Sequence, residues 1–148
     1  MITPPEAARL EAVLRRESRS LLQYVRESFP WVRHGKDEAL SEVQRIIGED
    51  RDALGSLSAF MARQRHPVIS LGAYPMRFTS MNFVSLEYLV PQLLQEGRKA
   101  VADLERDAGS LHGEAREEIE RLLDLKRKHL GQLEALLAAQ ARPAALVS

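Results

Sequence analysis

The sequence contains no cysteine, which excludes disulfide bonds, thiolate metal ligands and a cysteine nucleophile. Basic and acidic side chains number 21 each, so there is no net charge to indicate binding to nucleic acid or to an anionic membrane. No segment approaches the ~20 apolar residues that a transmembrane helix needs, and the first residues lack the features of a signal peptide. We therefore expect a cytoplasmic protein that binds neither nucleic acid nor membrane.

Aromatic residues make up only 5% of the chain and β-branched residues are few, whereas Leu, Ala, Glu and Arg dominate. These four are good helix formers. A length of 148 residues fits one domain. The sequence also lacks a glycine-rich phosphate loop, a Ser-His-Asp arrangement and a His pair at metalloprotease spacing, so a nucleophilic hydrolase is not expected.

Four segments carry apolar residues at helical spacing. The first opens with Thr3, Pro4 and Glu6, which form a capping box with proline at the first helical position, and it ends near Phe29. The second begins around Asp37 and ends before Pro67. The third is predicted from residue 79 or 80 to about 107, and the fourth from 110–114 to about 138.

The segment between the second and third helices, residues 66–78, is long for a loop in a compact domain. We expect a crossover along the bundle, so that the third helix starts at the same end as the first; Phe29 and Trp31 should close one end of the bundle. The prediction is an all-α, antiparallel four-helix bundle with one long crossover over residues 1–139, followed by a flexible tail over 140–148.

Charged or titratable side chains interrupt the apolar stripes of all four helices. They are Glu17, Asp50, Glu87, and the pair Lys126 and His129. Residues three and four apart share a helix face, so these side chains should point inward. A buried unpaired ion costs several kcal/mol, so the carboxylates must bind a cation, take up protons, pair with the basic residues or reach solvent. A metal resolves the conflict most simply, with iron or another divalent ion suited to these ligands.

At these positions the chain resembles the ferritin-like superfamily, including its rubrerythrin and bacterioferritin branches. That family places a Glu on the first and third helices and Glu-x-x-His on the second and fourth. Glu17 and Glu87 match the lone glutamates, and Asp50 matches the second-helix carboxylate. At two positions the sequence departs from the pattern: Ala53 stands where the His of the second helix should be, and Lys126 stands where the Glu of the fourth helix should be.

The resemblance implies a reduced metal site whose ligands are Glu17, Asp50, Glu87 and His129, with Lys126 and Tyr24 as neighbouring charge or redox partners. Counting from a turn at Arg33, Glu17 and Asp50 lie 16 and 17 residues away, and therefore at one level. Counting from a turn at Gly109, His129 is about 3 Å off the level of Glu87 and Lys126 about 7 to 8 Å off. This favours His129 over Lys126 as a site member. For Tyr24, a hydroxyl hydrogen-bonded in the core is the alternative.

Three functional classes follow, and the sequence leaves open whether the protein is an enzyme. The first is a metal-holding protein or an oxidoreductase acting on oxygen or peroxide. The second is a non-enzymatic structural or interaction bundle with a decayed site, with a homodimer formed through the third and fourth helices. The third is a carrier of apolar ligands, which only the long crossover favours. No particular small-molecule partner is indicated.

Overall fold

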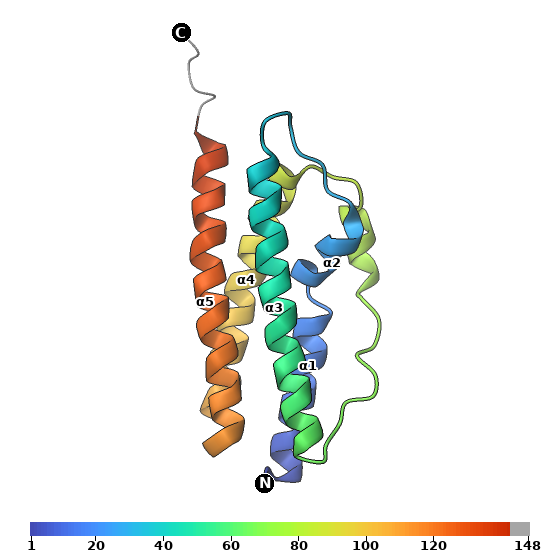
Figure 1. Ribbon diagram of the computed structural model, residues 1–148, viewed down its shortest axis with the longest axis vertical. Helices are drawn as coiled ribbons and strands as arrows, with labels where there is room; N and C mark the ends of the chain where they lie inside the picture. Colours follow the sequence, from blue (N-terminus) through green and yellow to red (C-terminus); the bar gives the residue numbers. More distant parts are fainter. Residues whose placement is uncertain (143–148) are drawn as a thin grey trace.

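The computed structural model describes residues 1–142 and confirms an all-α fold, with no strand in that range. Its elements are α1 (Pro4–Ser18), α2 (Leu21–Ser28), α3 (Asp37–Arg63), the 3-10 helix η1 (Met76–Met81), α4 (Leu86–Gly109) and α5 (Gly113–Ala141). The long helices lie side by side along the long axis of the molecule (Figure 1). None of the helices within these residues is both long and apolar enough to cross a membrane.

The first predicted helix is broken in two, which corrects the expectation of one continuous segment. The backbone N–H of Arg19 donates to the carbonyl of Arg15, and α1 ends there. The Ser20 hydroxyl then accepts from the backbone N–H of Gln23 at 3.3 Å and caps α2. Serine competes with the helical backbone for such hydrogen bonds, which explains why a new helix begins at this position.

The third long helix starts later than predicted, because Ser85 caps it by accepting from the backbone N–H of Tyr88 at 3.1 Å. Residues 76–81 form only a 3-10 turn. The start of α4 is anchored by the backbone N–H of Leu86, which donates to the carbonyl of Trp31 at 2.8 Å. It therefore lies at the end of the molecule where α2 stops, and the prediction that it shares an end with the start of α1 is wrong.

As a result, α3 and α4 run in the same direction, and the crossover returns along the α1–α2 side (Figure 1). Two arginines hold the crossover through its carbonyls: Arg15 Nε donates to Ser70 O at 3.0 Å, and Arg19 Nε to Gly72 O at 2.7 Å. Further along, the side chain of Phe78 is buried.

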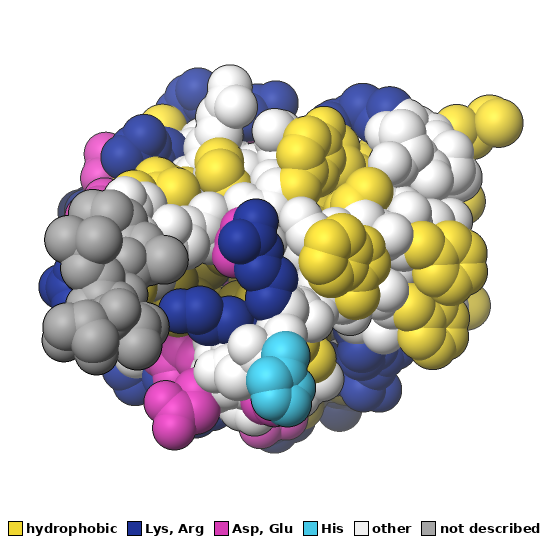
Figure 2. Space-filling view, turned by 90° about the horizontal axis from the view of Figure 1, so that it is seen from above, with side chains coloured by type: hydrophobic (Ala, Val, Ile, Leu, Met, Phe, Trp, Pro, Cys, Tyr) yellow, Lys and Arg dark blue, Asp and Glu magenta, His cyan; other side chains and the backbone are white. Residues whose placement is uncertain are grey.

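The end of the molecule near α4's first turn exposes aromatic side chains. Phe29 and Trp31, expected to close the bundle, are 69% and 54% exposed. Phe83 is 70% exposed, and its ring stacks on Phe29 with centroids 6.0 Å apart. Figure 2 looks down on this end and shows hydrophobic side chains gathered over one side of it. Helix α5 continues to Ala141, past the predicted start of the tail at residue 140, while residues 143–148 lie outside the described range.

The hydrophobic core is divided into two clusters. One is built around Leu10, Leu57 and Leu104, near the N-terminal end of α1. The other is built around Val25 of α2, Ile46 of α3 and leucines of α4. Between them, at the level of the α1–α2 break, lies a layer that contains buried charges. This layer is the candidate functional site.

Candidate functional site

Three charged side chains from three helices meet in the layer between the two core clusters. Glu17 comes from α1, Asp50 from α3 and Lys126 from α5, and they are 2%, 0% and 6% exposed. Each has leucine, valine or isoleucine one turn away on the same helix face, so helix formation forces the charge inward with its neighbours. The prediction that these positions face the interior is confirmed.

The ammonium of Lys126 lies between the two carboxylates. Its Nζ is 2.5 Å from Asp50 Oδ1 and 3.5 Å from Glu17 Oε1. Burial favours the neutral amine, but the negative charges of Asp50 and Glu17 outweigh it and raise the pKa of Lys126. Gln23 completes the group, because its Nε2 donates to Asp50 Oδ2 at 2.8 Å and to Ile47 O at 3.2 Å. The lysine is therefore the cation that lies between Glu17 and Asp50.

Arg16 extends the cluster to α4. Its Nε donates to Glu17 Oε2 at 2.8 Å, and its Nη2 donates to Asp107 Oδ2 at 3.0 Å. Asp103 Oδ2 lies 3.9 Å from the same guanidinium, and Arg9 lies 3.6 Å from Asp107. Burial opposes the charged form, but Glu17 and Asp107 together raise the pKa of Arg16. The carboxylates that α4 contributes near this layer are thus Asp103 and Asp107.

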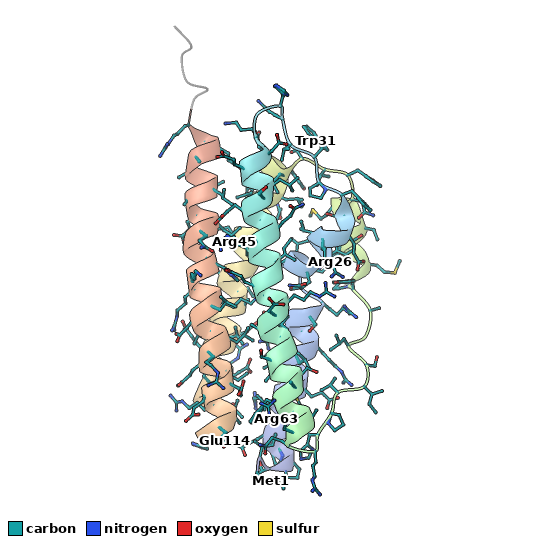
Figure 3. All side chains as sticks on the ribbon, in the orientation of Figure 1. Met1, Arg26, Trp31, Arg45, Arg63 and Glu114 are labelled. Carbon is teal, nitrogen blue, oxygen red and sulfur yellow. The ribbon has the colours of Figure 1, made fainter. Side chains whose placement is uncertain are left out.

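His129 is buried one turn beyond Lys126 but makes a separate contact. Its Nε2 lies 2.9 Å from Glu49 Oε1, and its Nδ1 has no hydrogen-bond partner. Burial lowers the pKa of His129 despite the neighbouring carboxylate. The neutral ring then donates from Nε2, and this hydrogen bond lowers the pKa of Glu49. Glu49 also accepts from Arg45 Nη1 at 3.0 Å; Arg45 is labelled on α3 in Figure 3.

Glu87 is not brought to the cluster. It lies in the first turn of α4, with Oε2 3.4 Å from Arg33 Nη2, and its carbonyl accepts from Gln140 Nε2 at 2.8 Å. Gln140 follows Lys126 by fourteen residues on α5, about 21 Å along the helix axis. Because α5 begins only at Gly113, the turn between α4 and α5 is centred near residue 111 and not at Gly109, so the position level with Glu87 moves from residue 131 to residue 135, further from His129 and Lys126.

Tyr24 makes its contacts outside the cluster, and the alternative interpretation of a hydrogen-bonded hydroxyl is confirmed. Its hydroxyl lies 2.6 Å from Asn82 Oδ1. Its ring packs on Tyr74 and Phe78 of the crossover, with centroids 5.2 and 5.6 Å away. Tyr24 therefore fixes the crossover and is not a partner of the charged group.

Five residues of the site were missed in the sequence, namely Arg16, Gln23, Glu49, Asp103 and Asp107. The two aspartates carried a signal, because they are four residues apart and flank the apolar Leu104. Gln23 was hidden by the helix break, which changes the phase of the face after Ser18. Arg16 and Glu49 lie beside the stripe residues Glu17 and Asp50, and nothing in the spacing singles them out.

The donor set does not fit the predicted metal. Within residues 1–142, no three or more His, Asp or Glu side chains are grouped so that they could hold a metal ion. Two carboxylates, Glu17 and Asp50, do converge, but the space between them holds the ammonium of Lys126. A divalent cation beside that ammonium would be repelled by it.

A cavity of about 410 Å³ opens beside the cluster, between the α1–α2 break, the crossover, α4 and α5. Lys126, His129 and Glu17 are part of its wall. Comparisons of the chain with protein-family models, with curated proteins and with solved structures give no match.

Proposed function

We propose that this protein is a ferritin-like four-helix bundle that works without a metal, as a structural or interaction protein. The connectivity supports the first part, since two helical hairpins are joined by one long crossover. The position of Lys126 carries the second part. Its ammonium contacts Glu17 and Asp50 at 3.5 and 2.5 Å, at a position where the family resemblance would place a metal-binding glutamate.

Elemental analysis tests this proposal on protein purified without an affinity tag, before and after incubation with ferrous iron under air. We expect less than a tenth of an equivalent of metal in both samples. The double variant Ala53→His, Lys126→Glu restores the two missing residue types and removes the internal cation. We expect it to bind iron measurably above the level of the parent chain.

The outcomes separate the two parts of the proposal. Metal near one equivalent in the parent chain would overturn metal independence and favour the competing proposal, an oxidoreductase or metal-holding protein using Glu17, Asp50 and His129. No binding by either chain would keep metal independence but remove the support for a ferritin-like origin of the site.

For the interaction role, we propose a homodimer formed through the aromatic end rather than through α4 and α5. Phe29 and Phe83 are both exposed, and both have left-handed backbone angles, with φ of 51° and 58°. Such angles cost a non-glycine residue about 1 kcal/mol or more, so their retention at exposed positions favours a use for the two rings. Sedimentation of the parent chain and of Phe29→Ser, Phe83→Ser should show a dimer that the variant loses; a monomeric parent would refute it.

A further inference from the structure

The cavity beside the charge cluster has the size and shape of a small-molecule site. Its volume of about 410 Å³ falls within the range of about 300 to 1,000 Å³ that is usual for ligand pockets. Its wall on α4 extends from Leu93 to Asp103, ten residues or about 15 Å along the helix. The space is thus elongated along the bundle and partly covered by the crossover.

The wall of the cavity changes from charged to apolar along its length. On α1 and α2 it passes from Arg15 and Arg16 to Leu21 and Leu22, and on α5 it passes from Lys126 to Leu133. Helix α4 runs in the opposite direction, so when the cavity is followed in the same sense its wall on α4 passes from Asp103 to Leu93. Charges therefore line one end of the cavity and leucines the other, except that Glu96, one turn from Leu93 on α4, is paired with Arg77 at 3.2 Å; this is the arrangement that an amphiphilic ligand requires.

The charged end has a surplus of cations. Arg16 and Lys126 are held by carboxylates of the cluster, while on the rim Arg15 pairs with Glu11 at 2.7 Å and Arg77 with Glu96 at 3.2 Å. Within the range that the structure describes, two of the cations that line the cavity are not paired with a carboxylate in this way.

These two cations are Arg19 and Lys99, and neither contacts a carboxylate within the described chain. Arg19 Nε donates to the carbonyl of Gly72, and its guanidinium lies 4.7 Å from the centre of the Tyr74 ring. Lys99 is exposed on α4, and no ion pair forms at its ammonium within residues 1–142. Both side chains are therefore available to an anion that enters the cavity.

We propose that the cavity binds a small carboxylate with an unbranched apolar tail. The carboxylate lies at Arg19 and Lys99, and the tail runs between Leu21, Leu93 and Leu133. The surplus of cations disfavours an amine, and a neutral alcohol lacks the charge that these two residues recognise. This inference goes beyond the proposed function, which gives the cavity no ligand, and it holds whether or not a metal binds.

Titration calorimetry with hexanoate, octanoate and decanoate tests the proposal on the full chain. We expect saturable binding of decanoate, with affinity rising about two- to fourfold for each added methylene. Decanol and decylamine should bind at least tenfold more weakly than decanoate. Amide chemical shifts should move at Gly97 and Ala100, which line the cavity, and not at Trp31, which lines a different pocket.

The double variant Arg19→Gln, Lys99→Gln should weaken decanoate at least tenfold and leave decanol unchanged. Arg98→Gln is the matched control, because this exposed arginine neighbours Lys99 but does not line the cavity, and it should change affinity less than twofold. As an independent check, Ala100→Phe should fill the cavity and abolish binding with an unchanged circular dichroism spectrum. The proposal would be overturned if decanoate did not bind saturably, or if decanol bound as tightly as decanoate. It would also be overturned if the chemical-shift changes were confined to Trp31, or if Arg98→Gln weakened decanoate binding as much as the double variant does.

Discussion

Replacement of Lys126 by methionine should destabilise the fold strongly. The substitution keeps the length of the side chain but removes the ammonium between two carboxylates that are almost completely buried. Glu17 retains its contact with Arg16 at 2.8 Å, and Asp50 retains only the Gln23 amide at 2.8 Å. Asp50 is therefore left as a buried charge without a cation.

The distances indicate the size of the effect. With an effective dielectric constant of 20, the attractions over 2.5 and 3.5 Å are about 7 and 5 kcal/mol. The cost of desolvating the ammonium, several kcal/mol, offsets part of this sum. We expect a net loss of about 3 to 5 kcal/mol, the usual consequence of removing one partner from a buried ion pair.

Urea unfolding at pH 7 measures this loss, provided that the free energy of unfolding depends on urea concentration with the same slope in parent and variant. Lys128→Met is the matched control on the same helix; Lys128 is exposed and lies 3.9 Å from Glu49, so we expect a change within about 0.5 kcal/mol. Adding Asp50→Asn to the Lys126 variant removes the orphaned charge and should recover at least half of the loss. A loss below about 1 kcal/mol for Lys126→Met would refute the reasoning, because the ammonium would then not compensate the carboxylates.

Three further predictions concern the same layer and its surroundings. Gln23→Ala should cost about 1 to 3 kcal/mol in urea unfolding, since it leaves a buried oxygen of Asp50 without its donor; a cost below 0.5 kcal/mol would contradict this. Ser20→Ala should cost about 1 kcal/mol by removing the cap of α2, which thermal unfolding measures, and Ser20→Asp should restore it. The ring resonances of His129 should titrate below the usual 6.5, because burial lowers the pKa of His129. As the pH falls, the unfolded state takes up this proton before the folded state does, so the stability that is present above pH 6.5 is lost below it. His129→Gln should reduce that loss. Titration of His129 above pH 6.5 would show instead that the hydrogen bond to Glu49 outweighs burial in setting its pKa.

Helix ends were less predictable than helix interiors, although their signals are local. Ser20 and Ser85 each cap a helix through a backbone N–H three residues on, and both serines are visible in the sequence. Apolar spacing continues through both positions, and it outweighed the caps in the prediction. For the same reason Phe83 was placed inside the predicted third helix, whereas it lies before α4 begins and takes a left-handed backbone angle.

The sequence by itself determined most of the positions that face the interior, because the helical period is a property of consecutive residues; Glu87 is the exception, since its side chain was predicted to point inward and is 40% exposed in the first turn of α4. That is why Glu17, Asp50, Lys126 and His129 were predicted to be buried before any contact was known. Only the tertiary structure decided which charges meet. A turn displaced by one residue changes which residues of two antiparallel helices face each other by two positions, about 3 Å, and the later turn before α5 places Glu87 away from the cluster, beside Arg33. The contact of Lys126 with both carboxylates depends on how α5 packs against α1 and α3, which no pattern of consecutive residues encodes.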